Sequence, residues 1–254
     1  MLTQTQFLDS LACPRCKTKL KLTRKHCAVC DFGFSCKQGV WKLLYNPHPV
    51  SETSRRLYEK LHRRKFAVPT DGVYEVLACF ARGNTTIDVA SGDGELESRV
   101  SETVGVEFAY NALRKSKNRG AKFLVQADAA HLPFVDDAFD LAICAGSLEH
   151  FADPELAISE MARVSKIQIL TVHKLPSFPA IQIVYNLLTH IISLQQQPIE
   201  QPLTWKRLEN LLIQAQLKII FKGVWTLPVN YGRVVKFLPE LKNLPSCHFV
   251  ITKK

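Results

Sequence analysis

The chain has 254 residues, of which 46% are hydrophobic and 22% charged, a composition typical of a soluble globular protein. No apolar run approaches the roughly 18–20 residues that span a bilayer, and the first residues lack the basic-then-apolar pattern of a signal peptide. We therefore expect a cytoplasmic protein whose eight cysteines serve as metal ligands or free thiols rather than as disulfides.

The net charge of +10 is concentrated near the N-terminus. Residues 1–66 hold 14 Lys and Arg but only 4 Asp and Glu, whereas the remainder of the chain is balanced. A local basic excess of this kind predicts a polyanionic partner, most often nucleic acid, which we expect to be RNA bound through residues 1–66. A solvated basic surface without a partner is the alternative.

The N-terminal module contains two Cys-x-x-Cys pairs separated by ten residues. Two such pairs supply the four thiolates of a closed structural zinc site, with Cys13, Cys16, Cys27 and Cys30 as ligands. A module of about 45 residues buries little core, so the metal would supply much of its folding free energy. We expect the nearby Cys36 to pack inside the module.

The segment after the cysteine pairs, Phe32–Leu44, would form a small apolar core beside the metal. Together with the pairs, residues 11–45 resemble the zinc-ribbon domain of small activators of RNA and protein methyltransferases. They are also similar to the ribbon at the N-terminus of bacterial ribosomal-RNA guanine N1-methyltransferases. The resemblance implies a zinc-ribbon domain over residues 1–45.

Residues 46–69 are predicted to be a linker and a basic helix. The two prolines of segment 46–49 disfavour a helix there, and Ser51 is a plausible N-cap for a helix over Glu52–Phe66. Its basic side chains either form a solvated face or extend a phosphate-binding surface. They are Arg55, Arg56, Lys60, Arg63, Arg64 and Lys65.

A glycine-rich turn follows the first predicted strand of the larger part of the chain. Thr85–Ala90 is predicted to be a buried strand that leads into the turn Ser91–Gly94, with a helix from Glu95. Gly92 and Gly94 permit backbone conformations closed to other residues and let a ligand approach closely. With free N–H groups at the helix N-terminus, the segment predicts a nucleotide-type site at the C-terminal end of a parallel strand.

Strands and helices then alternate, which predicts a parallel, doubly wound α/β sheet. Further strands are expected at Thr103–Glu107, Phe123–Ala127, Phe139–Cys144 and Ile167–Val172. Helices are expected at Asp71–Arg82, Ala109–Asn118 and from the N-cap Asp153 through Pro154 to about Val164.

Residues 70–254 resemble the class I S-adenosylmethionine-dependent methyltransferases, in the subgroup that contains the ubiquinone and menaquinone C-methyltransferases. In chain order, the motifs that carry the resemblance are Asp88–Gly94, Gly105–Glu107, Gln126–Ala129, Leu132–Asp140, Ser147–Pro154 and a late helix at Thr204–Ala215. The resemblance implies a Rossmann-like, doubly wound, seven-stranded sheet that binds S-adenosylmethionine.

The resemblance also assigns cofactor contacts to the strand ends. Glu107 would accept hydrogen bonds from both ribose hydroxyls, and Asp128 would accept one from the adenine amino group. The Ala129 N–H would reach an adenine ring nitrogen, and Phe108 would cover the adenine face. The other expected cofactor-binding residues are Asp88, Ala90, Gly92, Gly94 and Ala145, with the methionine part beside Asp88 and the glycine loop.

Two departures from the family pattern stand out. Ala90 occupies the position of the usual first glycine, so its methyl group tightens the turn. Ser165-Lys166 replaces a longer turn with Pro-Gly-Gly, which we expect to disturb the sheet edge rather than the cofactor pocket. Both departures keep a non-catalytic binding or scaffold protein open.

Methyl transfer needs a base only where the acceptor must lose a proton. His150, with Glu149 beside it, follows the fourth strand and is the candidate base, because an imidazole titrates near neutral pH. A structural hydrogen bond to a loop is the alternative role. A Glu-x-x-Glu-His metal site would have its first glutamate at Gly146, so we predict no catalytic metal.

Two enzymatic functions remain open beside the scaffold. RNA base methylation, of rRNA or tRNA, is the leading hypothesis because of the basic N-terminal residues and the ribbon resemblance. Methylation of a quinone, lipid or other apolar small molecule is the alternative. It rests on the subgroup resemblance and on the apolar segment Leu175–Pro202, which would cover the acceptor or meet a membrane surface. Packing of this segment against the domain is the alternative.

Overall fold

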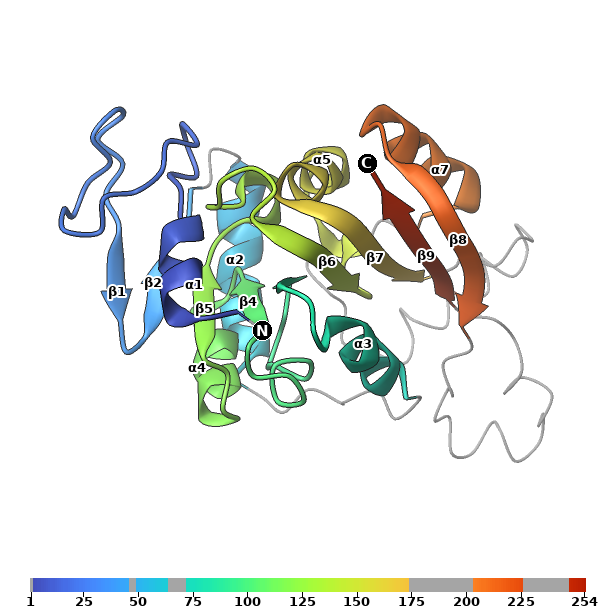
Figure 1. Ribbon diagram of the computed structural model, residues 1–254, viewed down its shortest axis with the longest axis horizontal. Helices are drawn as coiled ribbons and strands as arrows, with labels where there is room; N and C mark the ends of the chain where they lie inside the picture. The colour runs from blue at the N-terminus through green and yellow to red at the C-terminus, as the bar shows by residue number, and fades with distance from the viewer. Residues whose placement is uncertain (1, 46–48, 64–71, 174–202, 226–246) are drawn as a thin grey trace.

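The computed structural model describes residues 2–45, 49–63, 72–173, 203–225 and 247–254. Their strands form one sheet in the order β1-β2-β5-β4-β3-β6-β7-β9-β8 (Figure 1). The strands are β1 (Ser35–Lys37), β2 (Val40–Lys42), β3 (Thr86–Val89), β4 (Val104–Glu107), β5 (Phe123–Gln126), β6 (Phe139–Ala145), β7 (Ser165–His173), β8 (Lys218–Trp225) and β9 (Cys247–Lys253).

The middle of the sheet is parallel, as predicted. Strands β3 to β7 run in one direction, β9 runs antiparallel between β7 and β8, and β1 is antiparallel to β2. The described sheet has nine strands rather than the predicted seven, because two strands of the N-terminal module extend it. Since parallel strands share a carboxyl edge, the loops after β3, β4, β5 and β6 emerge together.

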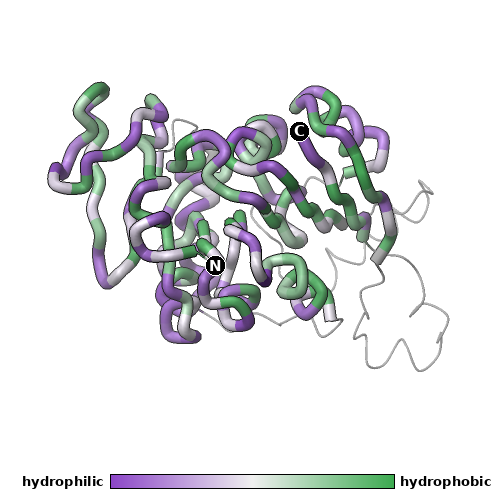
Figure 2. The backbone as a smooth tube through the Cα atoms, viewed as in Figure 1, coloured by the Kyte–Doolittle hydropathy of each residue, from purple (hydrophilic) through white to green (hydrophobic). Residues whose placement is uncertain are grey.

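Helices cover both faces of the sheet. On one face, α1, α5 and α7 pack on the larger apolar cluster, and on the other α3 and α4 pack on two smaller clusters. All residues of β3, β4 and β5 are buried, as expected for central parallel strands, and hydrophobic residues follow the middle of the sheet (Figure 2). The helices are α1 (Gln4–Ser10), α2 (Pro49–Leu61), α3 (Val73–Ala81), α4 (Tyr110–Asn118), α5 (Pro154–Val164) and α7 (Trp205–Gln214), with short 3₁₀ turns η1 (Ala129–His131) and η2 (Leu148–His150).

Two of the expected helix N-caps have different outcomes. Asp153 caps α5 as predicted, since its Oδ1 accepts from the Leu156 N–H at 2.8 Å. The prediction for Ser51 is wrong, because α2 already begins at Pro49. Proline suits the first turn of a helix, where its missing N–H leaves no bond unmade. Residues 64–66 of the expected helix lie outside the described residues.

The prediction of a helix from Glu95 is also wrong, because residues 92–99 form successive turns. The Glu95 carbonyl, which would accept from the Arg99 N–H in a helix, accepts instead from the Arg99 guanidinium at 2.7 Å and the Ser98 hydroxyl at 2.9 Å. The Arg99 N–H turns to Leu96 O. These side chains compete with the helical backbone for its acceptors.

The junction at Ser165-Lys166 does not disturb the sheet edge, contrary to expectation. Helix α5 ends at Val164 and β7 begins at the next residue, with Ser165 paired to Phe139. The buried Ser165 hydroxyl donates to Met161 O at 2.7 Å, which closes the end of the helix. Strand β7 lies inside the sheet, between β6 and β9.

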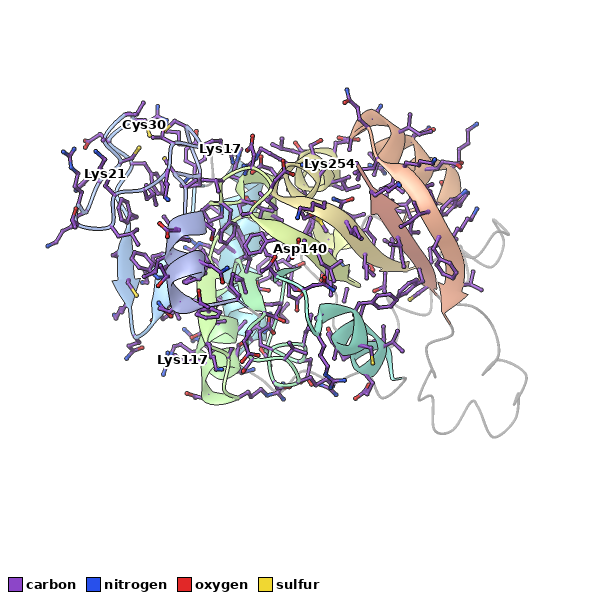
Figure 3. The ribbon with its side chains drawn as sticks, viewed as in Figure 1. Lys17, Lys21, Cys30, Lys117, Asp140 and Lys254 are labelled. Carbon is purple, nitrogen blue, oxygen red and sulfur yellow. The ribbon has the colours of Figure 1, made fainter. Side chains whose placement is uncertain are left out.

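The N-terminal module is continuous with the rest of the fold. Strand β2 pairs in parallel with β5, and the Phe7 and Phe123 rings stack with centroids 4.9 Å apart. Lys17 Nζ donates to the buried Glu160 carboxylate at 2.6 Å, so Lys17 lies on the inner side of the module (Figure 3). The module therefore shares both a sheet and a core with residues 72–173.

Among the described residues, no helix is both long and apolar enough to cross a membrane.

Candidate functional site

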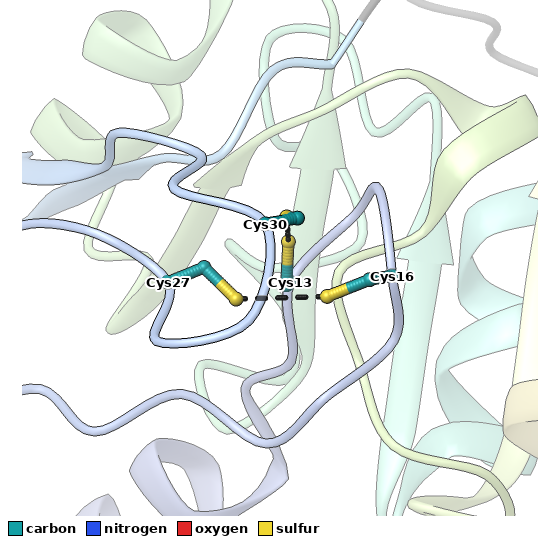
Figure 4. A group of neighbouring side chains, drawn as sticks. All are labelled: Cys13, Cys16, Cys27 and Cys30. Carbon is teal, nitrogen blue, oxygen red and sulfur yellow. Dashed lines mark hydrogen bonds between the residues drawn. The ribbon is translucent and has the colours of Figure 1, made fainter.

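The four cysteines of the two Cys-x-x-Cys pairs converge (Figure 4). Their Sγ atoms all lie within 4.8 Å of one another, with Cys13 to Cys30 at 3.4 Å and Cys16 to Cys27 at 3.5 Å. Ligands about 2.3 Å from a tetrahedral zinc would place their sulfur atoms about 3.8 Å apart. The spacing of the four sulfur atoms therefore suits a zinc ion.

The electrostatics of the cluster also suit a metal. Hydrogen bonding between its thiol and the Thr18 side chain lowers the pKa of Cys16 to about 6, whereas burial raises the pKa of Cys13. A metal ion would hold all four as thiolates. The prediction that Cys36 packs inside the module is wrong, since it is exposed on β1.

The second site forms where the loops after the parallel strands meet. Val89 is paired with Val106, and Glu107 with Gln126. The Ser91 N–H donates to Val106 O at 3.0 Å, and the Gly92 N–H donates to Glu107 Oε2 at 3.0 Å. The structure thus brings the glycine loop and the acid at the end of β4 together, as the sequence predicted.

The glycine loop has a left-handed backbone at three of the expected cofactor-binding residues. Gly92 has φ +54° and Gly94 has φ +84°. A Cβ on Gly92 would meet nothing within 4 Å, so this side of the loop is open to a ligand. A Cβ on Gly94 would lie 2.2 Å from Ser116 Oγ, so only glycine fits there. Ala90, at φ +62°, adopts the same conformation with a methyl group.

We predict that Ala90→Gly raises the free energy of unfolding by about 1 kcal/mol, because it relieves the left-handed strain of an L-residue. The melting temperature should rise by about 2–4 °C in calorimetry. The matched change Ala78→Gly, inside α3, should lower it, since glycine disfavours a helix. A fall in melting temperature for Ala90→Gly would show that the turn depends on the methyl group.

Glu107 is the polar centre of this edge. Its Oε1 accepts from the N–H groups of Phe108 at 2.7 Å and Ala109 at 2.9 Å, in addition to the bond from Gly92. Beyond it, the Ala127 N–H donates to Glu107 O at 3.2 Å, and Asp128 caps η1 through Ala130 N at 2.9 Å. Ala129 begins η1. The predicted adenosine-binding residues therefore follow two adjacent strands.

Two further acids are buried beneath the loop. Asp88 is 2% exposed and Glu97 is fully buried, and neither Glu97 oxygen has a hydrogen-bond donor among the described residues. Burial, followed by the charge of Glu107, raises the pKa of Asp88 to about 8. Burial, followed by Asp88, also raises the pKa of Glu97. Asp88 was predicted from its motif, but nothing in the sequence distinguished Glu97 from an exposed acid.

These raised pKa values predict that the two acids contribute less stability as the pH rises. Between about pH 4, where unfolded carboxyls titrate, and about pH 8, Asp88 binds more protons in the folded than in the unfolded state, so its contribution falls across that range. Glu97→Gln should flatten the fall of melting temperature from pH 5 to pH 8. The same change at the exposed Glu155 should leave the slope intact. Equal slopes in wild type and Glu97→Gln would contradict the prediction.

The candidate base lies after β6. Ala145 ends that strand, and η2 carries Glu149, 2% exposed, and His150, whose side chain is 12% exposed. His150 Nε2 lies 4.0 Å from Glu149 Oε1. Because β6 is adjacent to β3, this turn leaves the same sheet edge as the glycine loop.

Helix α2 and the residue directly after it contribute two residues that the sequence analysis did not identify, Glu59 and His62. His62 Nδ1 lies 2.7 Å from Asp93 Oδ1 in the glycine loop, and the other Asp93 oxygen accepts from Lys115 at 2.9 Å. Burial would raise the pKa of Asp93, but the bonds from His62 and Lys115 lower it. Glu59 accepts from the Tyr110 N–H at 2.7 Å. Neither residue belongs to a recognisable motif.

Residues 87–168, from β3 into β7, match the family model described as a methyltransferase domain. This segment is therefore similar to methyltransferase domains. The matched part of the methyltransferase domain contains the glycine loop, Glu107, Asp128 and His150. The match supports a methyltransferase-like role for this part of the chain.

Curated relatives of this segment have names that refer to quinones. The 2-phytyl-1,4-naphtoquinone methyltransferase of Nostoc punctiforme is 33% identical over 118 residues, 39% of this chain and 51% of that protein. The ubiquinone/menaquinone biosynthesis C-methyltransferase UbiE of Haemophilus ducreyi is 29% identical over 146 residues, 50% of this chain and 53% of that protein. The chain thus spans about half the length of these relatives.

Solved structures share the fold of the methyltransferase domain. A chain from the complex between the Haloferax volcanii Trm112 methyltransferase activator and a methyltransferase aligns with TM-score 0.57 and 12% identity, covering 82% of this chain and 99% of that chain. The [4+2]-cyclase SpnF aligns with TM-score 0.57 and 16% identity, covering 83% and 98%. Since SpnF is described as a cyclase, the fold alone does not fix the reaction.

Proposed function

We propose that this chain is an S-adenosylmethionine-dependent methyltransferase that acts on an apolar aromatic small molecule of the quinol type. The observation that carries the proposal is the hydrogen bond between Gly92 N and Glu107 Oε2, which places an open glycine loop beside a strand-end acid at one carboxyl edge. The carboxylate of Glu107 suits a ligand that carries sulfonium and ammonium charges, and such a ligand would favour the charged form of the buried Asp88. The Cys₄ cluster would hold a structural zinc ion.

The residues of this edge have distinct proposed roles. When bound, S-adenosylmethionine supplies an activated methyl group. Glu107 would hold the ribose, Asp128 and Ala129 the adenine, and Asp88 with the glycine loop the methionine part. His150 would take the proton that a hydroxyl acceptor loses as its ring carbon becomes nucleophilic, with Glu149 beside it to orient the imidazole.

The acceptor class rests on the relatives. The curated relatives are named for quinone methylation, which favours the small-molecule alternative over the leading RNA hypothesis of the sequence analysis. The apolar segment Leu175–Pro202, expected to cover such an acceptor, lies outside the described residues. Of the expected basic helix, Arg55 and Arg56 both contact Glu52, so their charges are partly neutralised.

RNA remains a second candidate because of one observation in the ribbon. Lys21, Arg24 and Lys25 have no acidic partner among the described residues, and Lys21 lies at the outer end of the module (Figure 3). Such cations can neutralise phosphates.

One experiment separates these functions. The zinc-loaded protein is incubated with S-adenosylmethionine carrying a tritiated methyl group and either a demethylated naphthoquinol with an apolar side chain or total RNA. We expect label in the organic extract of the quinol reaction. Label in RNA alone would replace the proposed acceptor with the second candidate. Absence of label from both, with no calorimetric binding of S-adenosylmethionine, would overturn the enzymatic function.

A further inference from the structure

Helix α2 supplies the N-cap that α4 lacks. Ala109 occupies the N-cap position of α4 and has no side chain that can accept from the first N–H groups. Glu59 takes this role across space, with Oε1 accepting from Tyr110 N at 2.7 Å and Oε2 from Asn111 N at 3.0 Å. The Asn111 amide donates back to Glu59 O at 3.0 Å. Helix α2 is therefore fixed to the segment that directly follows Glu107.

Beyond the last residue of α2, the chain also contacts the glycine loop. His62 Nδ1 and Asp93 Oδ1 are 2.7 Å apart, and their side chains are only 9% and 14% exposed. Asp93 stands between Gly92 and Gly94, both in left-handed conformations that leave the loop little stiffness of its own. A largely buried polar contact is worth more than an exposed one, so His62 constrains the loop.

We propose that α2, with the following His62, is a clamp on the two cofactor-binding loops, in which Glu59 and His62 are positioning residues for S-adenosylmethionine. Glu107 joins the same loops through Gly92 and Phe108, and the clamp joins them through Asp93 and Tyr110. The inference rests on the proposed function. It gives the helix between ribbon and domain a role in cofactor affinity, in place of the phosphate binding expected from its charge.

The test compares three variants of the zinc-loaded full chain. His62→Ala removes the contact, His62→Asn keeps an N–H donor close to the position of Nδ1, and Arg56→Ala changes a side chain of α2 that is 74% exposed. Calorimetry should show S-adenosylmethionine binding about tenfold weaker in His62→Ala, as expected for one lost buried hydrogen bond, with recovery in His62→Asn. Arg56→Ala should bind as wild type does.

Hydrogen exchange without cofactor provides an independent readout. The amides of Gly92, Ala109 and Tyr110 should exchange faster in His62→Ala than in wild type or Arg56→Ala, whereas amides of β6 should not change. If His62→Ala does not fold, Asp93→Asn weakens the same contact from the loop side and should give the same results.

The outcomes separate the clamp from the proposed function. If wild type does not bind S-adenosylmethionine, the proposed function fails, and the exchange rates alone decide whether α2 holds the loops. If wild type binds and His62→Ala matches it in both affinity and exchange, the clamp is wrong. Equal weakening by Arg56→Ala would also overturn it.

Discussion

Removal of zinc, or Cys13→Ser, is expected to destabilise the whole described fold and not only the ribbon. Structural zinc contributes about 10–16 kcal/mol in small zinc domains, which is comparable to the total stability of a typical domain. The N-terminal module shares the β2–β5 pairing, the Phe7–Phe123 stack and the Lys17–Glu160 ion pair with residues 72–173. Loss of this module would leave Glu160 buried without one of its cations and would leave β5 paired only with β4.

The measurement is a calorimetric melt with and without a zinc chelator. We expect one transition in the zinc-loaded chain. Chelation should lower the free energy of unfolding by at least about 4 kcal/mol, because a buried charge loses its partner and apolar surface becomes exposed at the same time. Cys36→Ser, at an exposed cysteine of the same module outside the cluster, should leave the melt unchanged. Two separate transitions, with the second insensitive to chelator, would show that the ribbon is an independent unit.

Glu107→Gln is expected to weaken S-adenosylmethionine binding by roughly 10- to 100-fold. A carboxylate that accepts from two ribose hydroxyls loses charge-assisted bonds worth about 1.5–3 kcal/mol when it becomes an amide. The substitution keeps the shape of the side chain, but the NH₂ group of the new amide is itself a donor. It would face one of the N–H donors of Gly92, Phe108 or Ala109 and leave that donor without its acceptor. Weaker binding should therefore come with a modest loss of stability.

The matched control is Glu102→Gln, which makes the same chemical change at an acid paired with Lys122 outside the proposed site. Its affinity for S-adenosylmethionine should equal that of wild type in isothermal titration calorimetry. Should Glu107→Gln retain wild-type affinity while it folds normally, the ribose would have to be held elsewhere and the assignment of the β4 end would fail.

Much of the site could be predicted because its residues follow strands. Asp88, Gly92 and Glu107 lie in or directly after two central parallel strands, whose carboxyl ends must meet at one edge. The cysteine spacing predicted a cluster for a similar reason, since tight Cys-x-x-Cys turns bring thiols together.

The remainder depends on contacts that no local pattern encodes. The burial of Glu97 and the His62–Asp93 pair arise from how distant segments dock. The helix expected from Glu95 does not form, because the Arg99 side chain competes with the backbone for the Glu95 carbonyl. One signal was available for Glu59: a helix whose N-cap is Ala109 must obtain its acceptor from another part of the chain.

The β2–β5 pairing has a consequence for assembly. Between two separate molecules, such a pairing of strands would depend on the concentration of each partner. Here the ribbon strand and the strand it borders are joined by one backbone, so dilution cannot part them and their stoichiometry is fixed at synthesis. Strand β1 is then the edge strand of the sheet at this side. It is only three residues long and ends in Lys37, and a short edge strand with a charged residue disfavours pairing with a further strand.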